Sequence, residues 1–355
     1  MYTWTTLALS AAVVAAEQTD AVTKESCLAL ALNGGGAKGA YQAGAMYGWM
    51  HEGNPDDFQW DVVTGISGGA INAGAMSVWA PEDGLAMSEW LSNQWNELRT
   101  HDVWNWWPGG IIAGLTTKPG LVDDTALVNY LAGILGDFSE GVKRTSMVGT
   151  VDANTADYQR WYLDEIPADK LLELGPRAIV SSASLPGLFI PQQFEGAVYV
   201  DGGTAMGLDA ISAVEKCLTL VGDDQTKVTL DIILLDRFVH PTTHEDDGDT
   251  LKNILRQHEI KSYYKGLENV ILTMLTYPNV NYRYILEPTG WYPKLWNLLN
   301  FGPENTWPMQ ENGMADAKAS LEAGEGAYFQ KFHDWIATRQ EHNQSISDFI
   351  QTYSQ

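Results

Sequence analysis

The residues best suited to chemistry are a serine set among glycines and an aspartate followed by glycines. Ser67 stands in Gly65-Ile-Ser-Gly-Gly69, which matches G-x-S-x-G between a β-type run and a helix-type run. A sharp strand–turn–helix strains the serine backbone, and flanking glycines relieve the clashes. The serine oxygen then stands at a helix N-terminus, where negative charge is favoured. Ser67 is therefore the candidate nucleophile, although a glycine-rich packing turn could give the same pentapeptide.

A second glycine cluster, Asn33-Gly-Gly-Gly-Ala-Lys-Gly39, lies at an earlier strand-to-helix junction. Its consecutive glycines present bare N–H groups, and the helix that follows completes an anion cradle. Lys38 either adds positive charge or anchors the loop. Gly34, Gly36 and Gly39 also fit a dinucleotide fingerprint, but the acid expected about 20 residues later has no counterpart. A phosphate loop needs Gly-Lys-Ser/Thr, which is absent. An oxyanion hole explains both glycine clusters together.

The third feature is Tyr199-Val-Asp-Gly-Gly203, in which an acid ends an apolar run. A serine nucleophile needs a base, normally a histidine held by a carboxylate. A carboxylate serves directly when it lies within hydrogen-bond reach in a dry pocket that raises its pKa. Gly202 and Gly203 would let other backbone come close to Asp201. Alone, Asp-Gly-Gly is more typical of a simple turn.

In this order the three motifs resemble the patatin-like phospholipase family. That family's pattern is G-G-G-x-[R/K]-G, then G-x-S-x-G, then D-G-[G/A], and here it stands as Gly34–Gly39, Gly65–Gly69 and Asp201–Gly203. The segment Ala183-Ser-Leu-Pro-Gly-Leu-Phe-Ile-Pro191 is similar to the one that precedes the family's aspartate strand. The resemblance covers about residues 27–205.

The resemblance implies a three-layer α/β/α patatin-like fold with a mainly parallel central sheet. It also implies a Ser–Asp dyad without a catalytic histidine, in which Ser67 attacks an ester carbonyl and Asp201 takes and returns the proton. Lys38 stands where arginine is commoner. No cofactor and no metal are expected. The implied oxyanion-hole residues are Gly34, Gly35, Gly36 and Gly68. The supporting residues are Lys38, Gly39, Gly65, Gly69, Gly202 and Gly203.

These features favour a hydrolase of lipid acyl esters, of the phospholipase A or lysophospholipase type. Several alternatives remain open. A triad of Ser67, Asp201 and His240 would suit the chain order of an α/β-hydrolase. Acyl transfer to an alcohol would use the same dyad. A secreted storage-type protein with a weak or vestigial site is the alternative outside the enzymes.

Short apolar runs alternate with helix-type segments, which argues for an α/β fold. We expect one domain over residues 24–345, with the recognised catalytic part at 27–205 and a helical C-terminal part with insertions at 206–345. Strands are expected at 27–33, 60–65, 145–152, 177–181, 197–200 and 228–235. Helices are expected at 39–51, 69–79, 83–98, 123–135, 209–217, 250–275 and 311–339.

Charge and the N-terminal segment bear on partners and location. With 45 acids against 21 bases, the net charge of −24 argues against nucleic-acid binding. Contact with a membrane or micelle should therefore be apolar rather than polybasic. Residues 1–16 are uncharged, apolar and end in small residues, which indicates a signal peptide and a secreted or endomembrane-lumen protein. No later stretch offers about 20 apolar residues for a transmembrane span.

Three further features are ambiguous. Cys27 and Cys217 are the only cysteines, and two separate buried thiols are slightly preferred over one disulfide. The tryptophan-rich segments 103–112 and 291–301 are interpreted mainly as packed core, with a lid or lipid-docking edge as the alternative. The acidic run 245–249 is expected to be a solvated loop.

Overall fold

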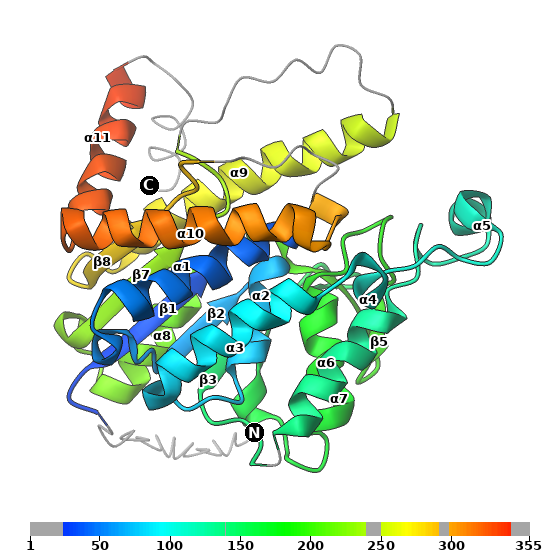
Figure 1. The fold of residues 1–355 in the computed structure, drawn as a ribbon, viewed down its shortest axis with the longest axis horizontal. Helices are drawn as coiled ribbons and strands as arrows, with labels where there is room; N and C mark the ends of the chain where they lie inside the picture. The colour runs from blue at the N-terminus through cyan, green and yellow to red at the C-terminus, as the bar shows by residue number, and fades with distance from the viewer. Residues whose placement is uncertain (1–23, 139, 239–249, 291–297, 342–355) are drawn as a thin grey trace, which may run out of the picture.

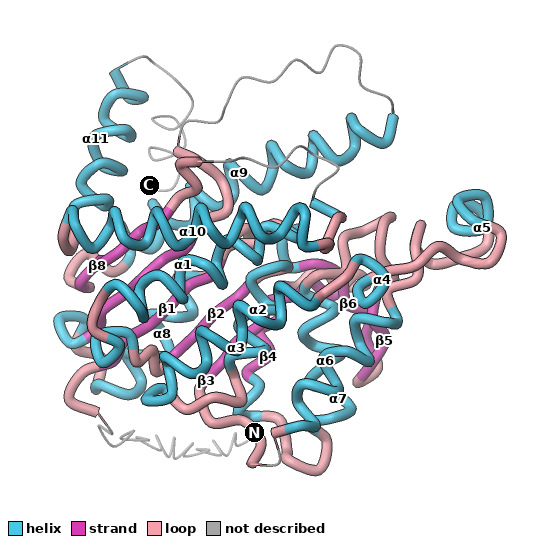
Figure 2. The backbone as a smooth tube through the Cα atoms, viewed as in Figure 1, coloured by secondary structure: helices cyan, strands magenta, loops and turns pink. Residues whose placement is uncertain are grey.

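The computed structural model describes residues 24–138, 140–238, 250–290 and 298–341, which are built around one sheet (Figures 1 and 2). Strand β1 (Cys27–Leu32) lies at its centre, parallel to β2 (Val62–Gly65) on one side and to β7 (Val228–Ile233) on the other. The remaining strands are β3 (Thr145–Asp152), β4 (Tyr158–Tyr162), β5 (Gln192–Phe194), β6 (Ala197–Asp201) and β8 (Asn281–Leu286).

The strand order is β5-β6-β3-β2-β1-β7-β8, with β4 paired to β3 off this path. The pairs β2–β3 and β7–β8 are parallel, whereas β4, β5 and β6 enter antiparallel pairs. The predicted α/β fold with a mainly parallel central sheet is confirmed. Because β7 and β8 extend the sheet beyond β1, the C-terminal third of the chain is part of the same sheet as the predicted catalytic part.

Helices cover both faces of the sheet (Figure 1). Side chains alternate along β1, so that Leu30 and Leu32 enter one core while Ala29 and Ala31 enter the other. The helices are α1 (Gly39–Glu52), α2 (Gly68–Met76), α3 (Gly84–Glu97), α4 (Thr100–Val103), α5 (Gly110–Thr116), α6 (Thr125–Asp137), α7 (Leu171–Ser182), α8 (Ala210–Val221), α9 (Thr250–Thr276), α10 (Pro303–Ala323) and α11 (Ala327–Glu341). Helices α1, α2, α3, α6, α7 and α10 pack on the first core, and α8, α9 and α11 pack on the second.

Two predicted elements are wrong. Residues 177–181, expected as a strand, lie inside helix α7, which continues through Pro176 and buries Leu171, Leu174 and Ala178 at helical spacing. The single helix expected at 311–339 is two helices, α10 and α11. They are separated at Gly324 and Gly326, whose φ angles of 88° and 74° are left-handed and end the first helix.

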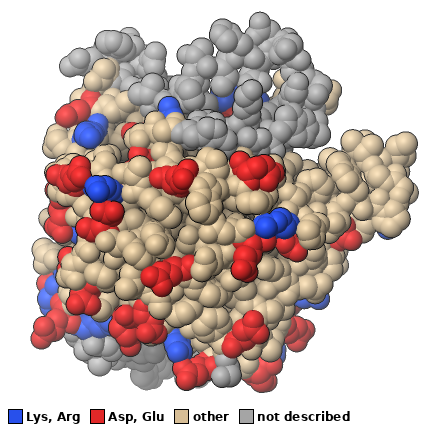
Figure 3. All heavy atoms as spheres, viewed as in Figure 1, with Lys and Arg blue, Asp and Glu red and all other residues tan. Residues whose placement is uncertain are grey.

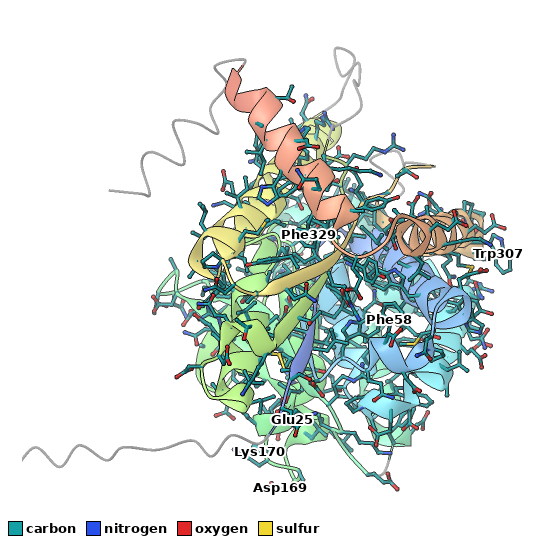
Figure 4. All side chains as sticks on the ribbon, turned by 90° about the vertical axis from the view of Figure 1, so that its left-hand side faces the viewer. Glu25, Phe58, Asp169, Lys170, Trp307 and Phe329 are labelled. Atoms are coloured by element: carbon teal, nitrogen blue, oxygen red, sulfur yellow. A yellow bond between two sulfur atoms is a disulfide. The ribbon has the colours of Figure 1, made fainter. Side chains whose placement is uncertain are left out.

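The described tryptophans range from fully buried to exposed. Trp49 and Trp60 are fully buried beside Phe58, whose ring stacks on that of Trp49 with centroids 5.5 Å apart. Figure 4 shows Phe58 inside the body and Trp307 at the outer edge of α10, where it is 53% exposed. The interpretation of segment 103–112 as packed core is wrong for its outer part, because Trp106, Ile111 and Ile112 are exposed. Residues 291–297 of the second tryptophan-rich segment lie outside the described residues.

Cys27 at the start of β1 and Cys217 on α8 form a disulfide, with Cα atoms 5.5 Å apart. The slight preference for two separate thiols is therefore wrong. The reason is geometric, because α8 packs directly on the face of β1 that carries Cys27. The bond ties the first strand to a helix 190 residues later in the sequence.

Replacing both cysteines with alanine is expected to lower the free energy of unfolding by about 2–5 kcal/mol. The loop closed by this disulfide is long, so that its removal frees much conformational entropy in the unfolded chain. Urea unfolding of the Cys27→Ala/Cys217→Ala variant and of the reduced wild type should give matching losses. Equal stability of the oxidised and reduced wild type would contradict the assignment of the bond.

Candidate active site

Ser67 lies on the sharp turn between β2 and α2, with φ 52° and ψ −119°. This positive φ is unusual for a residue with a side chain, and such strain is typical of functional sites. A Cβ on Gly65 would come 2.3 Å from the carbonyl oxygen of Gly69, so that the turn closes only with glycine there. The Ser67 N–H donates a hydrogen bond to Oγ of Ser182 (3.0 Å), which fixes the turn against α7.

Asp201 ends β6 beside this turn and is 1% exposed. Its Oδ1 accepts a hydrogen bond from the Gly203 N–H (2.6 Å), and its carboxyl lies close enough to the Ser67 side chain for that side chain to lower its pKa. A Cβ on Gly202 would come 2.2 Å from the carbonyl oxygen of Gly149, so that glycine allows the chain to turn close to β3. The predicted nucleophile and the predicted base therefore lie beside each other in the lining of one cavity.

Burial raises the pKa of the Asp201 carboxyl from its ordinary value of 3.8 to about 7. The hydrogen bond from the Gly203 N–H, the neighbouring Ser67 side chain and the positive charge of Lys261 lower the pKa and oppose this effect in part. Lys261 comes from α9, and its Nζ donates to the carbonyl oxygen of Thr204 (2.6 Å). A carboxylate with a pKa near neutrality can both accept and return a proton at physiological pH.

The predicted oxyanion loop lies directly against Ser67. A Cβ on Gly34 would be 3.3 Å from the Cβ of Ser67, and a Cβ on Gly68 would be 2.4 Å from the carbonyl oxygen of Gly36. The Gly34 N–H already donates to the carbonyl oxygen of Gly207 (3.0 Å). The structure therefore leaves Gly35, Gly36 and Gly68 as the candidate oxyanion donors, and gives Gly34 an anchoring position instead.

Two buried polar side chains hold the glycine loop in place. The Nζ of Lys38 forms an ion pair with Asp236 (2.7 Å) and donates to the carbonyl oxygen of Leu235 (3.1 Å) just after β7. Asn33 donates to the Gly207 carbonyl (2.6 Å) and accepts from the Leu235 N–H (3.1 Å). Of the two roles considered for Lys38, anchoring of the loop is the one that these contacts support.

A largely apolar cavity opens at the hydroxyl of Ser67. Its polar and charged lining includes Asp124, whose burial raises the pKa of that carboxyl to about 7. The Oδ1 atom of Asp124 has no hydrogen-bond partner among the described residues. The apolar lining residues are Ile71, Val103, Leu127, Ala183, Leu185, Phe189, Leu298, Leu299 and Phe301. In the described part of the chain, no group of three His, Cys, Asp or Glu side chains is arranged to hold a metal ion.

The sequence and the fold were compared with those of known proteins. A family model described as Patatin-like phospholipase matches residues 30–214, which is just over half of the chain. The chain belongs to the patatin-like phospholipase family. The solved structure of VipD from Legionella pneumophila is similar, with a TM-score of 0.39 and 15% identity, over 85% of this chain and 68% of that chain. No curated protein matches the sequence.

Membership of this family assigns the chain to the lipid hydrolases in general. The matched region contains the motifs at Gly34–Gly39, Gly65–Gly69 and Asp201–Gly203. The patatin-like region ends at residue 214, yet Asp236 and Lys261 lie beyond it and contact the glycine loop or the aspartate environment. The C-terminal third therefore contributes electrostatically to the patatin-like site.

Sequence reasoning missed several residues that position this site. Asp236 carries a readable signal, because it follows β7 at the sheet edge where the carboxyl ends of β1 and β2 also lie. Asn33 could have been noticed as the polar residue that ends β1. Ser182, Asp124 and Lys261 carry no comparable signal, because they reach the site from helix ends and faces that only the tertiary fold brings together.

Replacing Gly68 with alanine is expected to reduce kcat by about 10²–10³-fold. The added Cβ would stand 2.4 Å from the Gly36 carbonyl oxygen, so that the two candidate oxyanion donors must separate. The matched control is Gly133→Ala on α6, where an added Cβ meets nothing within 4 Å. Ester hydrolysis by both variants should be compared at equal folded concentration. Full activity of Gly68→Ala would exclude this pair as the oxyanion hole.

Proposed function

We propose that this protein hydrolyses carboxylic acyl esters of lipids with Ser67 as nucleophile and Asp201 as its base. The observation that carries the proposal is the position of the Ser67 side chain beside a buried carboxyl group, that of Asp201, whose pKa is raised to about 7 by burial. That pair opens into an apolar cavity beside a glycine loop. An activated serine, a proton acceptor and oxyanion donors are the parts that acyl transfer requires.

In the first half-reaction, Ser67 Oγ attacks the ester carbonyl carbon while Asp201 accepts the hydroxyl proton. The carbonyl oxygen becomes an oxyanion and accepts hydrogen bonds from the N–H groups of Gly35, Gly36 and Gly68. Collapse of this intermediate breaks the ester C–O bond, and Asp201 returns its proton to the departing alcohol. The acyl chain is then held on Ser67 as an ester.

In the second half-reaction, water attacks the acyl-serine ester, and Asp201 takes the proton of the water. The carboxylate then returns that proton to Ser67 Oγ as the fatty acid leaves. No histidine lines the cavity in the part of the chain that the structure describes. His240, the histidine of the triad alternative, lies outside the described residues.

The charges of the cavity favour a particular arrangement of the lipid. Among the described residues, Asp124, Asp201, Asp236 and Glu259 line it together with one cation, Lys38, which is paired with Asp236. An anionic phosphate would be repelled from this interior, whereas the ester and an acyl chain suit its apolar walls. We infer that the acyl chain enters while the head group stays outside, as phospholipase A or lysophospholipase action on a phospholipid allows.

Release of fatty acid from phosphatidylcholine and lysophosphatidylcholine tests this proposal, with Ser67→Ala as the matched control. Rapid release that depends on Ser67 is the expected result. Adding a long-chain alcohol to the same reaction separates hydrolysis from acyl transfer, because transfer would yield a new ester. A folded wild type that is inert on both lipids and on nitrophenyl esters would instead favour a storage-type protein.

We further propose that the protein works in an oxidising compartment as one domain spanning residues 24–345. The Cys27–Cys217 disulfide supports such a compartment. The sheet shared by the catalytic part and residues 228–286 supports a single domain. The predicted signal peptide, residues 1–16, lies outside the described residues. None of the helices in the described part of the chain is long and apolar enough to span a membrane.

A further inference from the structure

A lobe of the chain extends from the body and ends in an exposed apolar tip. Residues 104–122, called here the apolar lobe, contain α5 at the tip and stand clear of the sheet (Figure 1). Ile112 and Leu115 on α5 are each 72% exposed, and Ile111 and Trp106 are 47% and 52% exposed. Such a group of large exposed apolar side chains on one projection marks an interaction surface.

Specific contacts hold the two legs of the apolar lobe together. The backbone of Asn105 pairs with that of Asp123 in both directions, at 2.8 Å and 2.9 Å. The Trp107 Nε1–H donates to the carbonyl oxygen of Gly120 (3.0 Å), and the Nζ of Lys118 lies 4.7 Å from the centroid of the Trp107 ring. A lobe tied at its base in this way presents its tip to the surroundings instead of folding it onto the body.

The apolar lobe differs from the rest of the protein in charge. Residues 104–122 contain no Asp or Glu and one Lys, in a chain with 45 acids in 355 residues and a net charge of −24. Figure 3 shows the lobe as an extension free of acidic side chains at its tip, while red side chains are spread over the body. An apolar tip without carboxylates suits insertion among acyl chains. The strongly negative body is repelled by an anionic membrane and not by a zwitterionic one.

The base of the apolar lobe is continuous with the candidate active site. A groove beside it is lined by Trp104, Trp106, Leu121 and Val122 from the lobe, and by Phe189 and Leu299 from the body. Phe189 and Leu299 also line the cavity at Ser67. The groove and the cavity are therefore neighbours that share the apolar side chains of Phe189 and Leu299, and the groove lies on the side of the cavity that faces the lobe.

We propose that the apolar lobe docks this protein on a zwitterionic lipid surface, with Ile112 and Leu115 inserted, and guides an acyl chain along the groove to Ser67. The guiding role rests on the function proposed above, whereas the docking role does not need catalysis. A second copy of this chain is the other occupant that the tip could accept. Self-association through the tip would be recognised by the size of the lipid-free protein in solution, which would be that of a dimer.

The docking test is flotation with phosphatidylcholine vesicles, performed on the full chain in the Ser67→Ala background so that no lipid is consumed. The Ile112→Asn/Leu115→Asn variant should bind these vesicles at least about tenfold more weakly. The matched control is Leu172→Asn/Leu275→Asn, which alters two leucines that are 55% and 61% exposed outside the lobe. The control should float like its parent.

A second readout separates docking from catalysis. With Ser67 restored, the lobe variant should hydrolyse a soluble nitrophenyl butyrate at the wild-type rate but release fatty acid from vesicles at least about tenfold more slowly. Unchanged flotation of the lobe variant, or binding that needs anionic lipid, would overturn the docking proposal. So would a lipid-free dimer that the Ile112→Asn/Leu115→Asn change dissociates. If the folded wild type did not hydrolyse the nitrophenyl ester at all, that result would instead refute the proposed function.

Discussion

Replacing Ser67 with alanine is expected to lower ester hydrolysis by at least about 10³-fold while leaving the fold intact. The change removes the hydroxyl that attacks the ester, but adds no atom to the strained turn at φ 52°. The Ser67 N–H keeps its hydrogen bond to Ser182 because that contact uses the backbone. Hydrolysis of nitrophenyl esters, measured with circular dichroism on the same samples, checks both parts of this expectation.

A matched serine change controls for nonspecific effects. Ser88 is buried on α3, and its hydroxyl bonds only to the Leu85 carbonyl of the same helix among the described contacts. Ser88→Ala should therefore retain activity. If Ser67→Ala turned over esters at the wild-type rate, the nucleophile would have to be another residue.

Replacing Asp201 with asparagine is expected to change activity and stability in opposite directions. Activity should fall by about 10²–10⁴-fold, because the amide cannot accept the Ser67 proton. The free energy of unfolding should rise by on the order of 1–4 kcal/mol near pH 8, because a buried carboxylate is replaced by a neutral group of nearly the same shape. The Gly203 N–H can still donate to the side-chain oxygen.

The gain in stability should depend on pH in a defined direction. In the folded protein the pKa of Asp201 is about 7, above its ordinary 3.8. Between these values the folded state binds more protons than the unfolded state, so that this group makes the wild type less stable as pH rises. Asp201→Asn lacks that titration. The difference in unfolding free energy between variant and wild type should grow from about pH 4 to about pH 7 and then level off.

The same pKa predicts the acid limb of wild-type activity. Asp201 must be ionised to accept a proton, so that kcat/KM should rise with pH and level off above about pH 7. Asp124, whose pKa is also raised by burial, does not affect the comparison of stabilities, because the wild type and Asp201→Asn both contain it. A stability difference that stayed constant from pH 4 to pH 8 would contradict the buried, titrating carboxylate at position 201.

Local sequence signals predicted the central part of the fold well. The apolar run after residue 26 and the glycines after it correctly indicated β1 and the following loop, because a buried parallel strand has no polar face. The glycine clusters also indicated where backbone segments approach closely. At Gly65, Gly68 and Gly202 an added Cβ would meet another backbone atom within 2.4 Å, so that these positions record a three-dimensional constraint in the sequence itself.

The failures have physical causes. Ile179 and Val180 are β-branched and follow Pro176, which is typical of a strand, but packing of the whole amphipathic segment on the sheet outweighs that local preference. The strands β4, β5 and β8 were missed because their pairing depends on partners far along the chain. In β8 the buried Arg283 is stabilised by Asp231 of β7, a contact that no local pattern indicates.

The candidate site shows the same division between local and tertiary information. Ser67 and Asp201 were predicted from motifs, because each needs glycines beside it that are visible in the sequence. The disulfide and the Lys38–Asp236 ion pair join residues that lie 190 and 198 positions apart in the sequence, and Lys261 acts on Asp201 from another helix. Such contacts depend on the topology of the sheet, so that no local sequence pattern predicts them.

The most direct test of the central claim is to locate the adduct of a fluorophosphonate by intact mass and peptide mapping. The experiment uses the wild type, Ser67→Ala and Asp201→Asn. A single adduct on Ser67 of the wild type, absent from Ser67→Ala and formed far more slowly on Asp201→Asn, is the predicted result. An adduct on another residue, or equal labelling of the wild type and Asp201→Asn, would contradict a Ser67 nucleophile activated by Asp201.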